Sequence, residues 1–400
     1  MDGNTDNPRS RLGSRGAGLL RLALLLFCLA LGLLGAAVGL YLRSRPPVPA
    51  FHRGFTPVTL DWTDANCWVP DAEVEHLLAP GADFTAVNDD GEPIRYQAAA
   101  IAPGGASFRD DGIQTPVFAV AVGDSFTFGH GVRLEECWVE RLESSCRADV
   151  VNLGVSNIFG PTQYLRTLRR HGLPLRPKVV IWATFVNDWL DDTLFRCWTD
   201  ATRVLGRQIE YPRSRPLYDA IRRVAYCQPD ESPPFPPLDA RVPYAADGLC
   251  FTFDATAYAV QDVGFAAIAA GRDSAADAVR EARAAAEGAG AALVVVVIPA
   301  KEQVYHRQAA AVLGYARTQA SAAFAAAVAA DCAAQDILCL DLLPVLRERA
   351  ARGEQLYFRE DGHWNAAGHR VAAEAIEAFL GQTGRTRPDG PGGGGATPEE

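Results

Sequence analysis

Five short runs of apolar residues, rich in Val and Ile, recur from residue 116 onward. Such runs, with few polar interruptions, are typical of strands that are buried on both faces of a sheet. The runs are PVFAVAV (116–122), ADVVNL (148–153), KVVIWAT (178–184), ALVVVVI (292–298) and ILCLDL (337–342). The pattern therefore predicts five buried strands.

Longer stretches with helical periodicity separate most of these runs. They are EECWVERLESSCR (135–147), QYLRTLRRHG (163–172), SAADAVREARAAAEGAG (274–290) and RTQASAAFAAAVAADCAAQ (317–335). Strands that alternate with helices form βαβ units, whose strands run parallel. We therefore expect an α/β protein with a three-layer α/β/α (flavodoxin-like) fold and a mostly parallel, five-stranded sheet.

A different pattern occupies residues 22–42, where twenty-one consecutive residues carry no charge. A helix of this length spans about 30 Å, the thickness of the hydrocarbon core of a bilayer. A cleaved signal peptide is the alternative, but its apolar region is only about 7–15 residues long. Arginines are more numerous before the segment than after it, which favours a cytoplasmic N-terminus. The sequence thus predicts one transmembrane helix, a single-pass protein of the cell membrane, and a main domain that is extracytoplasmic (periplasmic or extracellular).

The remaining segments differ in composition. Residues 43–112 begin with RSRPPVPA and continue with turn signals between short apolar runs, which predicts a tether and a small β-rich lead-in. Residues 113–381 hold the five runs and should form the main domain. Within it, residues 190–270 lack a clean periodicity and predict an insertion near the site or a structural cap. We expect residues 1–21 to be a cytoplasmic tail and the Gly-rich residues 382–400 to be disordered.

Composition excludes two classes of protein. Of the 400 residues, 48% are hydrophobic and 22% charged, which is the balance of a folded globular chain. The net charge is −10, and Arg and Lys form no dense run beyond the first fifteen residues. A wholly disordered protein is therefore excluded, and we expect no nucleic-acid partner.

The chain has nine cysteines, of which one, Cys28, lies in the predicted membrane span. The other eight are Cys67, Cys137, Cys146, Cys197, Cys227, Cys250, Cys332 and Cys339. An even number in an oxidising compartment predicts up to four disulfides, and buried free thiols are the alternative. No CxxC or HExxH spacing occurs, so we expect no metal site and no cofactor.

Polar residues of particular kinds follow four of the apolar runs. Ligands of open parallel sheets bind at the carboxyl ends of the strands, so these residues should share one rim. They are Gly123-Asp124-Ser125, Asn152-Leu153-Gly154, Phe185-Val186-Asn187-Asp188 and Glu360-Asp361-Gly362-His363-Trp364-Asn365. A serine, a glycine, an asparagine and an acid with a histidine are thus predicted to come together.

The order and spacing of these blocks over about residues 116–380 resemble the SGNH (GDSL-type) hydrolases. The resemblance implies a serine nucleophile that is activated by a histidine and an acid, and an oxyanion hole made of three donors. The catalytic residues that it implies are Ser125, His363 and Asp361. The implied oxyanion donors are the N–H groups of Ser125 and Gly154 and the side-chain amide of Asn187.

The chemistry of these residue types agrees with the resemblance. A serine hydroxyl is a weak nucleophile until an imidazole takes its proton, and the imidazole needs an acid to hold its tautomer and stabilise its charged form. The tetrahedral oxyanion needs donors that are fixed in advance. Each residue also has a plain structural interpretation: Ser125 as a turn residue or helix N-cap, Gly154 as a tight turn, and Asn187 as a helix start.

Two positions depart from the family pattern. Phe185 stands where the third block usually has glycine, which puts the local turn in question. Glu360, rather than Asp361, has the usual spacing of the acid before His363. We favour Asp361, because Asp-x-His-Trp-Asn resembles the variant block of bacterial polysaccharide O-acetylation proteins, the alginate acetyltransferase-like members of the superfamily. Glu360 remains the alternative acid.

Two further residues are candidates for substrate binding. His130 follows the serine block between two glycines and is expected to line the pocket or only a turn. Lys301 is one of only two lysines, and its Pro-x-Lys context is similar to segments in the acetylation-type proteins. Neither residue changes the expectation that the site holds no metal and no cofactor.

Together these observations predict a membrane-anchored serine esterase that removes O-acyl groups, most plausibly O-acetyl, from a carbohydrate or another ester. The first alternative is an O-acetyltransferase that passes the acyl group to a polysaccharide hydroxyl. The second is a non-catalytic envelope-assembly or carbohydrate-binding protein with a vestigial site. The partners expected are the acylated substrate and the membrane, which the N-terminal helix would span.

Overall fold

The computed structural model describes residues 67–101, 106–208, 241–254, 256–314 and 323–385, together with Leu26 and Gly32. The chain divides into two units, residues 1–48 and 49–400, and the described ranges belong to the second. In the described part of the chain no helix combines the length and apolar character needed to cross a bilayer. Apart from Leu26 and Gly32, the predicted span lies outside the described residues, as do the cytoplasmic tail and the last fifteen residues of the predicted disordered tail.

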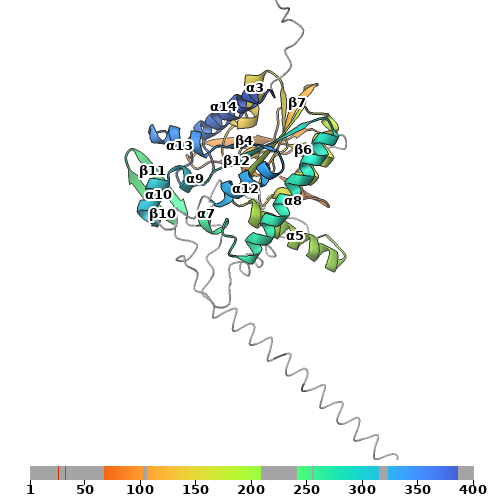
Figure 1. Cartoon of the computed structure of the whole chain (residues 1–400), viewed down its shortest axis with the longest axis horizontal. Coiled ribbons are helices and arrows are strands. Elements are labelled where there is room, and N and C mark those ends of the chain that lie inside the picture. The colour runs from red at the N-terminus through yellow and green to blue at the C-terminus, as the bar shows by residue number, and fades with distance from the viewer. Residues whose placement is uncertain are drawn as a thin grey trace, which may run out of the picture. The chain divides into compact units, whose positions relative to one another are not determined.

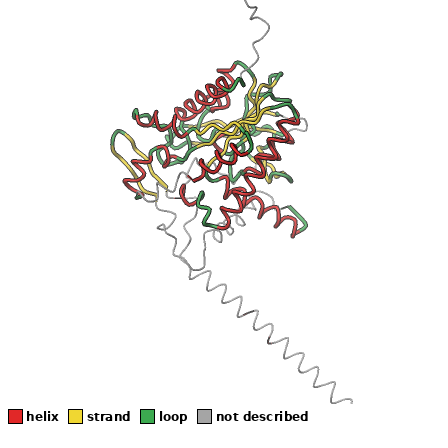
Figure 2. The backbone as a smooth tube through the Cα atoms, in the orientation of Figure 1, coloured by secondary structure: helices red, strands yellow, loops and turns green. Residues whose placement is uncertain are grey.

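A parallel sheet of five strands forms the centre of the fold, with helices on both of its faces (Figures 1 and 2). Its strand order is β13-β12-β9-β7-β8. The strands are β7 (Val117–Val122), β8 (Asp149–Asn152), β9 (Val179–Phe185), β12 (Ala292–Ile298) and β13 (Leu338–Asp341). All five predicted strands are confirmed. In chain order the arrangement is 2-1-3-4-5, the order of the flavodoxin-like class.

The register of the sheet brings the carboxyl ends of its central strands together. Val122 at the end of β7 lies opposite Trp182 in β9, and Phe185 at the end of β9 lies opposite Ile298 in β12. All paired strands in this sheet are parallel. The residues that follow β7, β9 and β12 therefore lie along one edge of the sheet.

Helices cover both faces of the sheet (Figure 1). On one face α3 (Trp138–Cys146) packs against α14 (Ala366–Gln382). On the other, α8 (Ala266–Gly288) packs against α4 (Pro161–Thr167) and α5 (Asp188–Leu205). The remaining helices are α2 (Ser125–Phe128), α7 (Thr256–Ala259), α9 (Lys301–Val304), α10 (His306–Leu313), α12 (Ala323–Ala334) and α13 (Leu343–Ala351), with 3₁₀ turns η2 (Leu134–Glu136) and η4 (Leu173–Leu175) and a π turn η3 (Leu168–Gly172). The predicted three layers are thus present.

Six short strands precede the main sheet. They are β1 (Trp68–Asp71), β2 (Glu75–Leu78), β3 (Asp83–Val87), β4 (Pro93–Gln97), β5 (Ala99–Ala100) and β6 (Ser107–Phe108). In β4 the buried Tyr96 stacks on Phe128 at 5.7 Å between ring centroids, and its hydroxyl accepts a 2.9 Å hydrogen bond from the Gly131 N–H. This β-rich region thus packs directly against the segment that follows β7.

The region 190–270 has more regular structure than the sequence pattern predicts. Helix α5 has eighteen residues, and its buried positions include Leu190, Leu194 and Trp198, spaced four apart on one face. The aromatic and charged residues between these positions hid that period. Farther along, β10 (Arg241–Ala246) and β11 (Leu249–Asp254) form an antiparallel hairpin. Residues 209–240 lie outside the described part.

The expected disulfides are absent among the described cysteines. Cys137, Cys146, Cys197, Cys250, Cys332 and Cys339 are free thiols. The buried Cys137 shows why: its Sγ donates to Thr127 O at 3.4 Å instead of bonding to another sulfur. Cys28 and Cys227 are not among the described residues. The prediction of up to four disulfides is therefore not supported.

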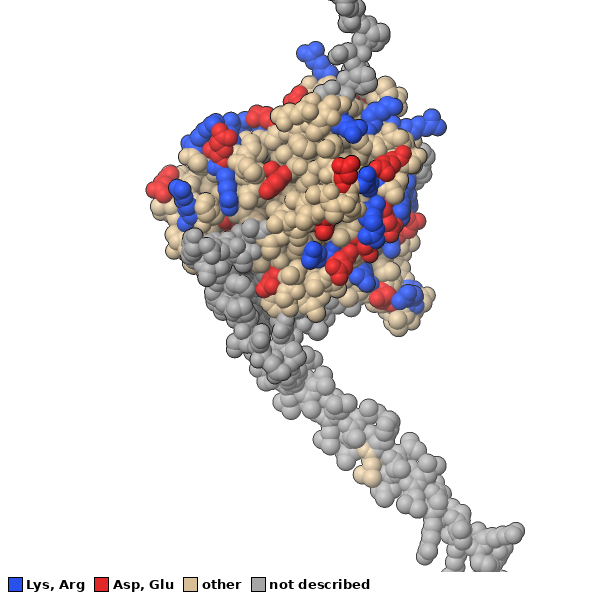
Figure 3. Space-filling view, viewed as in Figure 1, with Lys and Arg blue, Asp and Glu red and all other residues tan. Residues whose placement is uncertain are grey.

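On the face shown in Figure 3, acidic and basic side chains alternate along the rim and no broad area of one sign is seen. Exposed ion pairs among the described residues include Arg169 with Glu281 at 2.9 Å and Arg280 with Asp277 at 2.7 Å. Exposed pairs of this kind contribute little to stability, typically about 0–1 kcal/mol each. The charge of this face is therefore mixed, as the composition suggested.

Candidate active site

The turn after β7 holds Ser125 at the carboxyl edge of the sheet. Asp124 is the N-cap of α2, and its Oδ1 accepts a 2.9 Å hydrogen bond from the Phe126 N–H. Ser125 is the first residue of α2 and is half-buried, whereas Phe126 and Phe128 are fully buried in the core. The cap is thus made by Asp124 rather than by Ser125, which leaves the serine hydroxyl available for chemistry.

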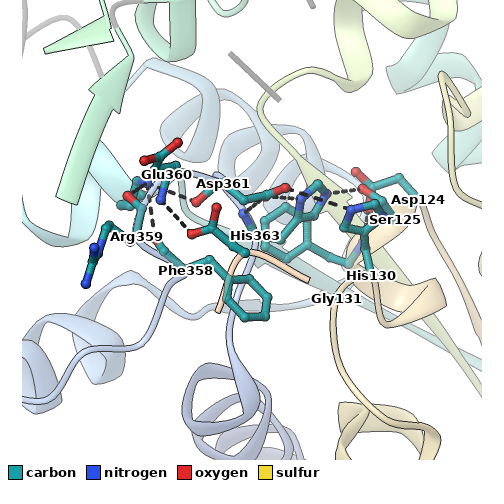
Figure 4. Close-up of polar contacts among 12 residues, drawn as sticks. Asp124, Ser125, His130, Gly131, Phe358, Arg359, Glu360, Asp361 and His363 are labelled. Atoms are coloured by element: carbon teal, nitrogen blue, oxygen red, sulfur yellow. Dashed lines mark hydrogen bonds and ion pairs between the residues drawn. The ribbon is translucent and has the colours of Figure 1, made fainter. Parts of the chain in front are cut away.

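Ser125, His363 and Asp361 form a continuous chain of polar contacts (Figure 4). Ser125 Oγ lies 2.7 Å from His363 Nε2, and His363 Nδ1 lies 2.5 Å from Asp361 Oδ1. The same carboxylate oxygen accepts the His363 backbone N–H at 2.7 Å. Glu360 is exposed, and its N–H donates to Asp89 Oδ2 at 2.8 Å. Of the two candidate acids, Asp361 is therefore the one that contacts the histidine.

The charge state of Asp361 follows from its neighbours. Burial of Asp361, which is 2% exposed, disfavours its ionised form. The positive charge that His363 can carry and the hydrogen bonds from His363 outweigh that cost, so the pKa of Asp361 lies below its ordinary value. An ionised acid next to the imidazole is the arrangement that stabilises an imidazolium.

Aromatic side chains hold the imidazole in place. Phe126 packs on His363 and on Trp364, in both cases with ring centroids 4.9 Å apart. Phe185, at the position where the family usually has glycine, lies 4.5 Å from Phe126. The aromatic residue therefore extends this packing, and β9 continues through Phe185 without a break.

His130 lies against the triad. Its ring stacks on His363 with centroids 4.4 Å apart, and its Nε2 is 3.8 Å from Asp361 Oδ2. Burial, and secondarily the charge of His363, lowers the pKa of His130 to about 3, so this second imidazole is neutral. Gly129 and Gly131 both have φ of +80°, and a Cβ on Gly131 would lie 2.6 Å from the Phe358 ring. Glycine at position 131 thus lets the turn that carries His130 pack against Phe358. His130 is 7% exposed, and its predicted contact with substrate stays a prediction.

Lys301 supports the loop that carries the acid. Its Nζ donates to the carbonyl oxygens of Phe358, Arg359 and Asp361 at 3.3, 3.1 and 2.9 Å. The side chain is 1% exposed. Because an ammonium group has only three donors, all of them are used by residues 358–361, which we call the acid loop. The expected substrate contact is therefore replaced, in this structure, by a contact that positions the acid loop.

The two further oxyanion candidates already have partners within the chain. The Gly154 N–H donates to Asn152 Oδ1 at 2.9 Å. Asn187 Nδ2 donates to Asp191 Oδ2 at 2.8 Å, and its Oδ1 has no hydrogen-bond partner among the described residues. An amide has two N–H donors, so the second hydrogen of Asn187 Nδ2 is available to a substrate. Although Asn187 is the N-cap of α5, its side chain makes no capping bond, so the plain helix-start interpretation does not account for it.

The requirement for glycine at position 154 is steric. A Cβ there would lie 2.4 Å from Phe128 N and 2.6 Å from Thr127 C, both backbone atoms of α2. Backbone atoms of a packed helix cannot move aside without moving the helix. Gly154 therefore lets the second block approach the helix that begins with Ser125.

Two supporting residues were not predicted from the sequence. Asn152, besides accepting from Gly154, donates through Nδ2 to Thr127 O at 2.8 Å. Arg109, fully buried, donates to Phe128 O at 3.1 Å and to Val132 O at 2.6 Å, and its guanidinium lies 4.4 Å from the Tyr96 ring centroid. A polar residue at the end of a doubly buried strand could have indicated Asn152. No local pattern indicates Arg109.

Asp188 is a second buried carboxylate, close to Asp124 in the turn that carries Ser125. Asp188 Oδ1 accepts from the Tyr164 hydroxyl at 2.9 Å, and its Oδ2 accepts from Thr184 Oγ1 at 2.5 Å. Burial raises the pKa of Asp188 well above its ordinary value, and the nearby Asp124 raises it further. Burial also raises the pKa of Asp124, to about 6, against the opposing effect of His363. Keeping these two acids ionised therefore carries an electrostatic cost next to Ser125.

The site also offers three metal-ligand atoms, from His130, Asp361 and His363, within 4.8 Å of one another. Asp361 Oδ1 lies 2.5 Å from His363 Nδ1, and His363 Nε2 lies 2.7 Å from Ser125 Oγ. Those short contacts favour proton transfer along the chain of three residues as the chemistry of this site.

Known proteins resemble this chain in two ways: weakly in structure over about two thirds of its length, and by a family match in its C-terminal part. No curated protein matches the sequence. Among solved structures, a putative lipolytic protein of the G-D-S-L family from Desulfitobacterium hafniense is 16% identical with a TM-score of 0.38, covering 66% of this chain and 99% of its own. A catalytic mutant of the acetylxylan esterase Axe2 from Geobacillus stearothermophilus is 11% identical with a TM-score of 0.36, covering 67% and 96%.

These two structural similarities are too weak to carry a functional argument. The family described as the SGNH hydrolase-like domain of the acetyltransferase AlgX matches residues 253–392. That range includes Lys301, the acid loop and His363, and ends after α14. The resemblance predicted from the motifs is therefore confirmed: this chain is similar to the SGNH hydrolases, and through residues 253–392 to their AlgX-like members.

Proposed function

We propose that this protein is a serine-dependent acyl enzyme of the SGNH type, acting as an esterase on O-acyl groups. The observation that carries the proposal is the contact chain in which Ser125 Oγ lies 2.7 Å from His363 Nε2 and His363 Nδ1 lies 2.5 Å from Asp361 Oδ1. These are hydrogen-bond distances between a nucleophile, a base and an orienting acid. Ser125 and His363 occupy the positions that the motif order assigned to these roles, and Asp361 is the acid that the Asp-x-His-Trp-Asn block favoured over Glu360.

In the proposed mechanism Ser125 Oγ attacks the acyl carbonyl carbon while His363 Nε2 takes the hydroxyl proton. Asp361 accepts the Nδ1–H bond and stabilises the resulting imidazolium. The tetrahedral intermediate collapses as the imidazolium returns its proton to the leaving alcohol, and an acyl-serine remains. Water, activated by the neutral imidazole, attacks this ester, and the serine is regenerated.

The oxyanion is stabilised, in this proposal, by the Ser125 N–H at the start of α2 and by the second amide hydrogen of Asn187. The Gly154 N–H contributes only if it leaves Asn152 Oδ1, now 2.9 Å away, or bonds to both oxygens at once. Removing one oxyanion donor typically lowers kcat by about 10²–10³. This geometry ranks Asn187 above Gly154 as a donor.

We further propose an O-acetyl group on a carbohydrate as the substrate. The support is the match of residues 253–392 to a domain of an acetyltransferase, and the Asp-x-His-Trp-Asn block. The uncharged residues 22–42 and the arginines before them support a membrane anchor with the catalytic domain outside the cytoplasm. The protein would then act on envelope or exported polysaccharides.

Transfer of the acetyl group to a polysaccharide hydroxyl is the second candidate function. The AlgX-like match favours it specifically, because the matching domain is named for an acetyltransferase. Water and a sugar hydroxyl compete for the same acyl-serine, so the triad is common to both reactions. The products distinguish them: with an activated acetyl ester and a glycan present, an esterase yields free acetate and a transferase yields acetylated glycan.

The proposal is tested with the full chain in detergent, an active-site serine reagent and p-nitrophenyl acetate. We expect a fluorophosphonate to label Ser125 and to abolish turnover, and Ser125→Ala to be neither labelled nor active. Ser144→Ala, which alters an exposed serine, is the matched control and should retain both properties. Absence of labelling and turnover in a folded wild-type chain would indicate the third possibility, a binding protein with a vestigial site.

A further inference from the structure

A cluster of carboxylates lies outside the triad, between α3 and the segment that precedes β7. Asp111, Glu140 and Glu143 each present a carboxylate oxygen, and the three oxygens lie within 4.8 Å of one another. Glu140 and Glu143 are three residues apart on α3, so they share one face of the helix. Asp111 approaches them from the loop. We call these three residues the acidic triplet.

The decisive feature of the acidic triplet is an unsatisfied buried oxygen. Glu140 is only 9% exposed, and its Oε1 has no hydrogen-bond partner among the described residues. A buried carboxylate oxygen without a donor is costly in a folded protein. The buried Arg109 lowers the pKa of Glu140 through its charge, but the hydrogen bonds of its guanidinium go to backbone carbonyls, among them those of Phe128 and Val132. No described residue therefore donates a hydrogen bond to Glu140 Oε1.

Neighbouring contacts fix the other carboxylates. Glu143 Oε2 accepts from the Val150 N–H at 2.8 Å. Asp110 is held by the N–H groups of Gly112 and Asn152 at 2.8 and 2.7 Å, which orients the loop that carries Asp111. Burial, and secondarily the surrounding carboxylates, raises the pKa of Glu140 to about 9. The backbone thus holds several acids together against their mutual repulsion.

The acidic triplet opens into a surface cavity of about 730 Å³. Six carboxylate side chains and two guanidinium groups line this cavity. One of the two, Arg370, is already paired with Glu374 at 2.8 Å, and the other, Arg141, donates through Nε to Glu136 O at 3.0 Å. The cavity therefore admits water and small ions and carries a net negative charge.

We propose that the acidic triplet binds one divalent cation, Ca²⁺, with water from the cavity completing its coordination. The donors are all oxygens, which hard cations prefer, and no histidine or cysteine belongs to the triplet. Ca²⁺ binds oxygens at about 2.3–2.6 Å and tolerates irregular geometry, whereas Mg²⁺ demands a near-ideal octahedron. The three oxygens lie within 4.8 Å of one another, close enough for all of them to reach one ion, and the open cavity leaves room for water.

The consequence of binding is structural. The ion joins α3 to the loop before β7, and α3 packs against α14, whose N-cap is Asn365, just after His363. The Trp138 N–H at the start of α3 also donates to His369 Nδ1 in α14 at 3.3 Å. Ca²⁺ would therefore stabilise the packing of α3 against α14 without contacting the substrate. Helix α3 follows the Ser125 segment in the chain, and α14 follows His363.

The test uses the full chain, freed of metal with a chelator, and titrates CaCl₂ or MgCl₂ by calorimetry and by thermal unfolding. We expect one bound Ca²⁺ per chain and a rise in Tm of roughly 3–5 °C at about 100 times Kd. Glu140→Gln and Glu143→Gln should each weaken Ca²⁺ binding at least about tenfold. Glu377→Gln, which alters the same cavity outside the acidic triplet, is the control and should bind as the wild type does.

Glu140→Gln also separates a lost ligand from a lost fold. Because glutamine stays neutral among the surrounding carboxylates, the metal-free form of this variant should be at least as stable as the metal-free wild type. Wild-type protein that neither binds Ca²⁺ nor gains Tm would overturn the proposal, as would an unchanged Ca²⁺ response in Glu140→Gln. Binding of Mg²⁺ as tight as that of Ca²⁺ would overturn the assignment of the ion.

Discussion

The sharpest test of the active-site assignment compares Asp361→Asn with Glu360→Gln. The two acids are adjacent in sequence, and the family's usual spacing favours Glu360. Asp361 is 2% exposed and its Oδ1 accepts two hydrogen bonds from His363, whereas Glu360 is exposed. The two amide variants keep shape and remove one charge each, so they isolate the charge that serves the imidazole.

The expected magnitude follows from the geometry. With charge centres about 4 Å apart and an effective dielectric constant of about 20, the Asp361–imidazolium attraction is about 4 kcal/mol. That corresponds to a rate factor of about 10³, and an asparagine that stabilises the wrong tautomer adds to the loss, as in serine proteases, where the total is about 10⁴. We therefore expect Asp361→Asn to lower kcat by about 10³–10⁴ and Glu360→Gln to leave it within about twofold.

The assay is the initial rate of p-nitrophenyl acetate hydrolysis by the full chain, with thermal unfolding of each variant as the control for folding. Asp361→Asn should hydrolyse this small, activated ester far more slowly than the wild type does. Glu360→Gln should hydrolyse it as fast as the wild type does. If Glu360→Gln abolishes turnover while a folded Asp361→Asn retains it, the assignment of the acid is wrong. The acid loop would then have to reorganise in the functional enzyme.

Three further predictions follow from residues that hold the site together. Lys301→Met removes the donor to three carbonyls of the acid loop and should lower kcat about 10–100-fold with a smaller change in KM, measured by steady-state kinetics. Gly154→Ala places a Cβ 2.4 Å from the backbone of α2 and should cost about 1–3 kcal/mol in urea unfolding, while Gly288→Ala, with open space around it, should not. Burial raises the pKa of Asp124 from 3.8 to about 6, so its folded form holds a proton more strongly than the unfolded chain does. Its stabilising contribution is therefore present below about pH 4 and lost as the pH rises through about 6, and Asp124→Asn should remove up to about 3 kcal/mol of that pH dependence. Exposed Asp273→Asn should leave the pH profile unchanged.

The sheet could be predicted because its strands are buried on both faces. In a strand that is buried on both faces, every side chain points into the apolar interior. Such a strand therefore appears in the sequence as a nearly uninterrupted apolar run, as Val179–Phe185 and Ala292–Ile298 do. The rim position of Ser125 and Asn187 follows from the same runs, because each residue comes just after a strand ends. Local pattern and tertiary fold agree at these positions.

Helix α5 could not be identified in the same way, although its apolar residues have a helical period. Acidic residues at Asp191 and Asp192 interrupt its apolar face and are nevertheless buried. Asp192 is accommodated because its Oδ1 accepts from the Thr162 N–H at 2.6 Å, and Asp191 Oδ2 accepts from Asn187. The partner of Asp192 is thirty residues away in the sequence, so no pattern within α5 reveals why this acid can be buried.

The choice between Asp361 and Glu360 depends on contacts from two separate parts of the chain. The β10–β11 hairpin binds the acid loop through the Thr252 N–H, which donates to Arg359 O at 2.8 Å, and through Arg241, which donates to Glu360 O at 2.7 Å. The β-rich lead-in binds it through Asp89, which accepts the Glu360 N–H at 2.8 Å.

These contacts use the backbone of the acid loop and turn the Glu360 side chain to solvent, which leaves Asp361 as the residue directed at His363. Since any sequence could supply backbone N–H and C=O groups, the loop sequence alone does not determine which acid faces inward. The region 190–270 therefore has a specific geometric consequence: its hairpin orients the acid loop without supplying a catalytic side chain. Changes in that hairpin should accordingly alter turnover through the position of Asp361.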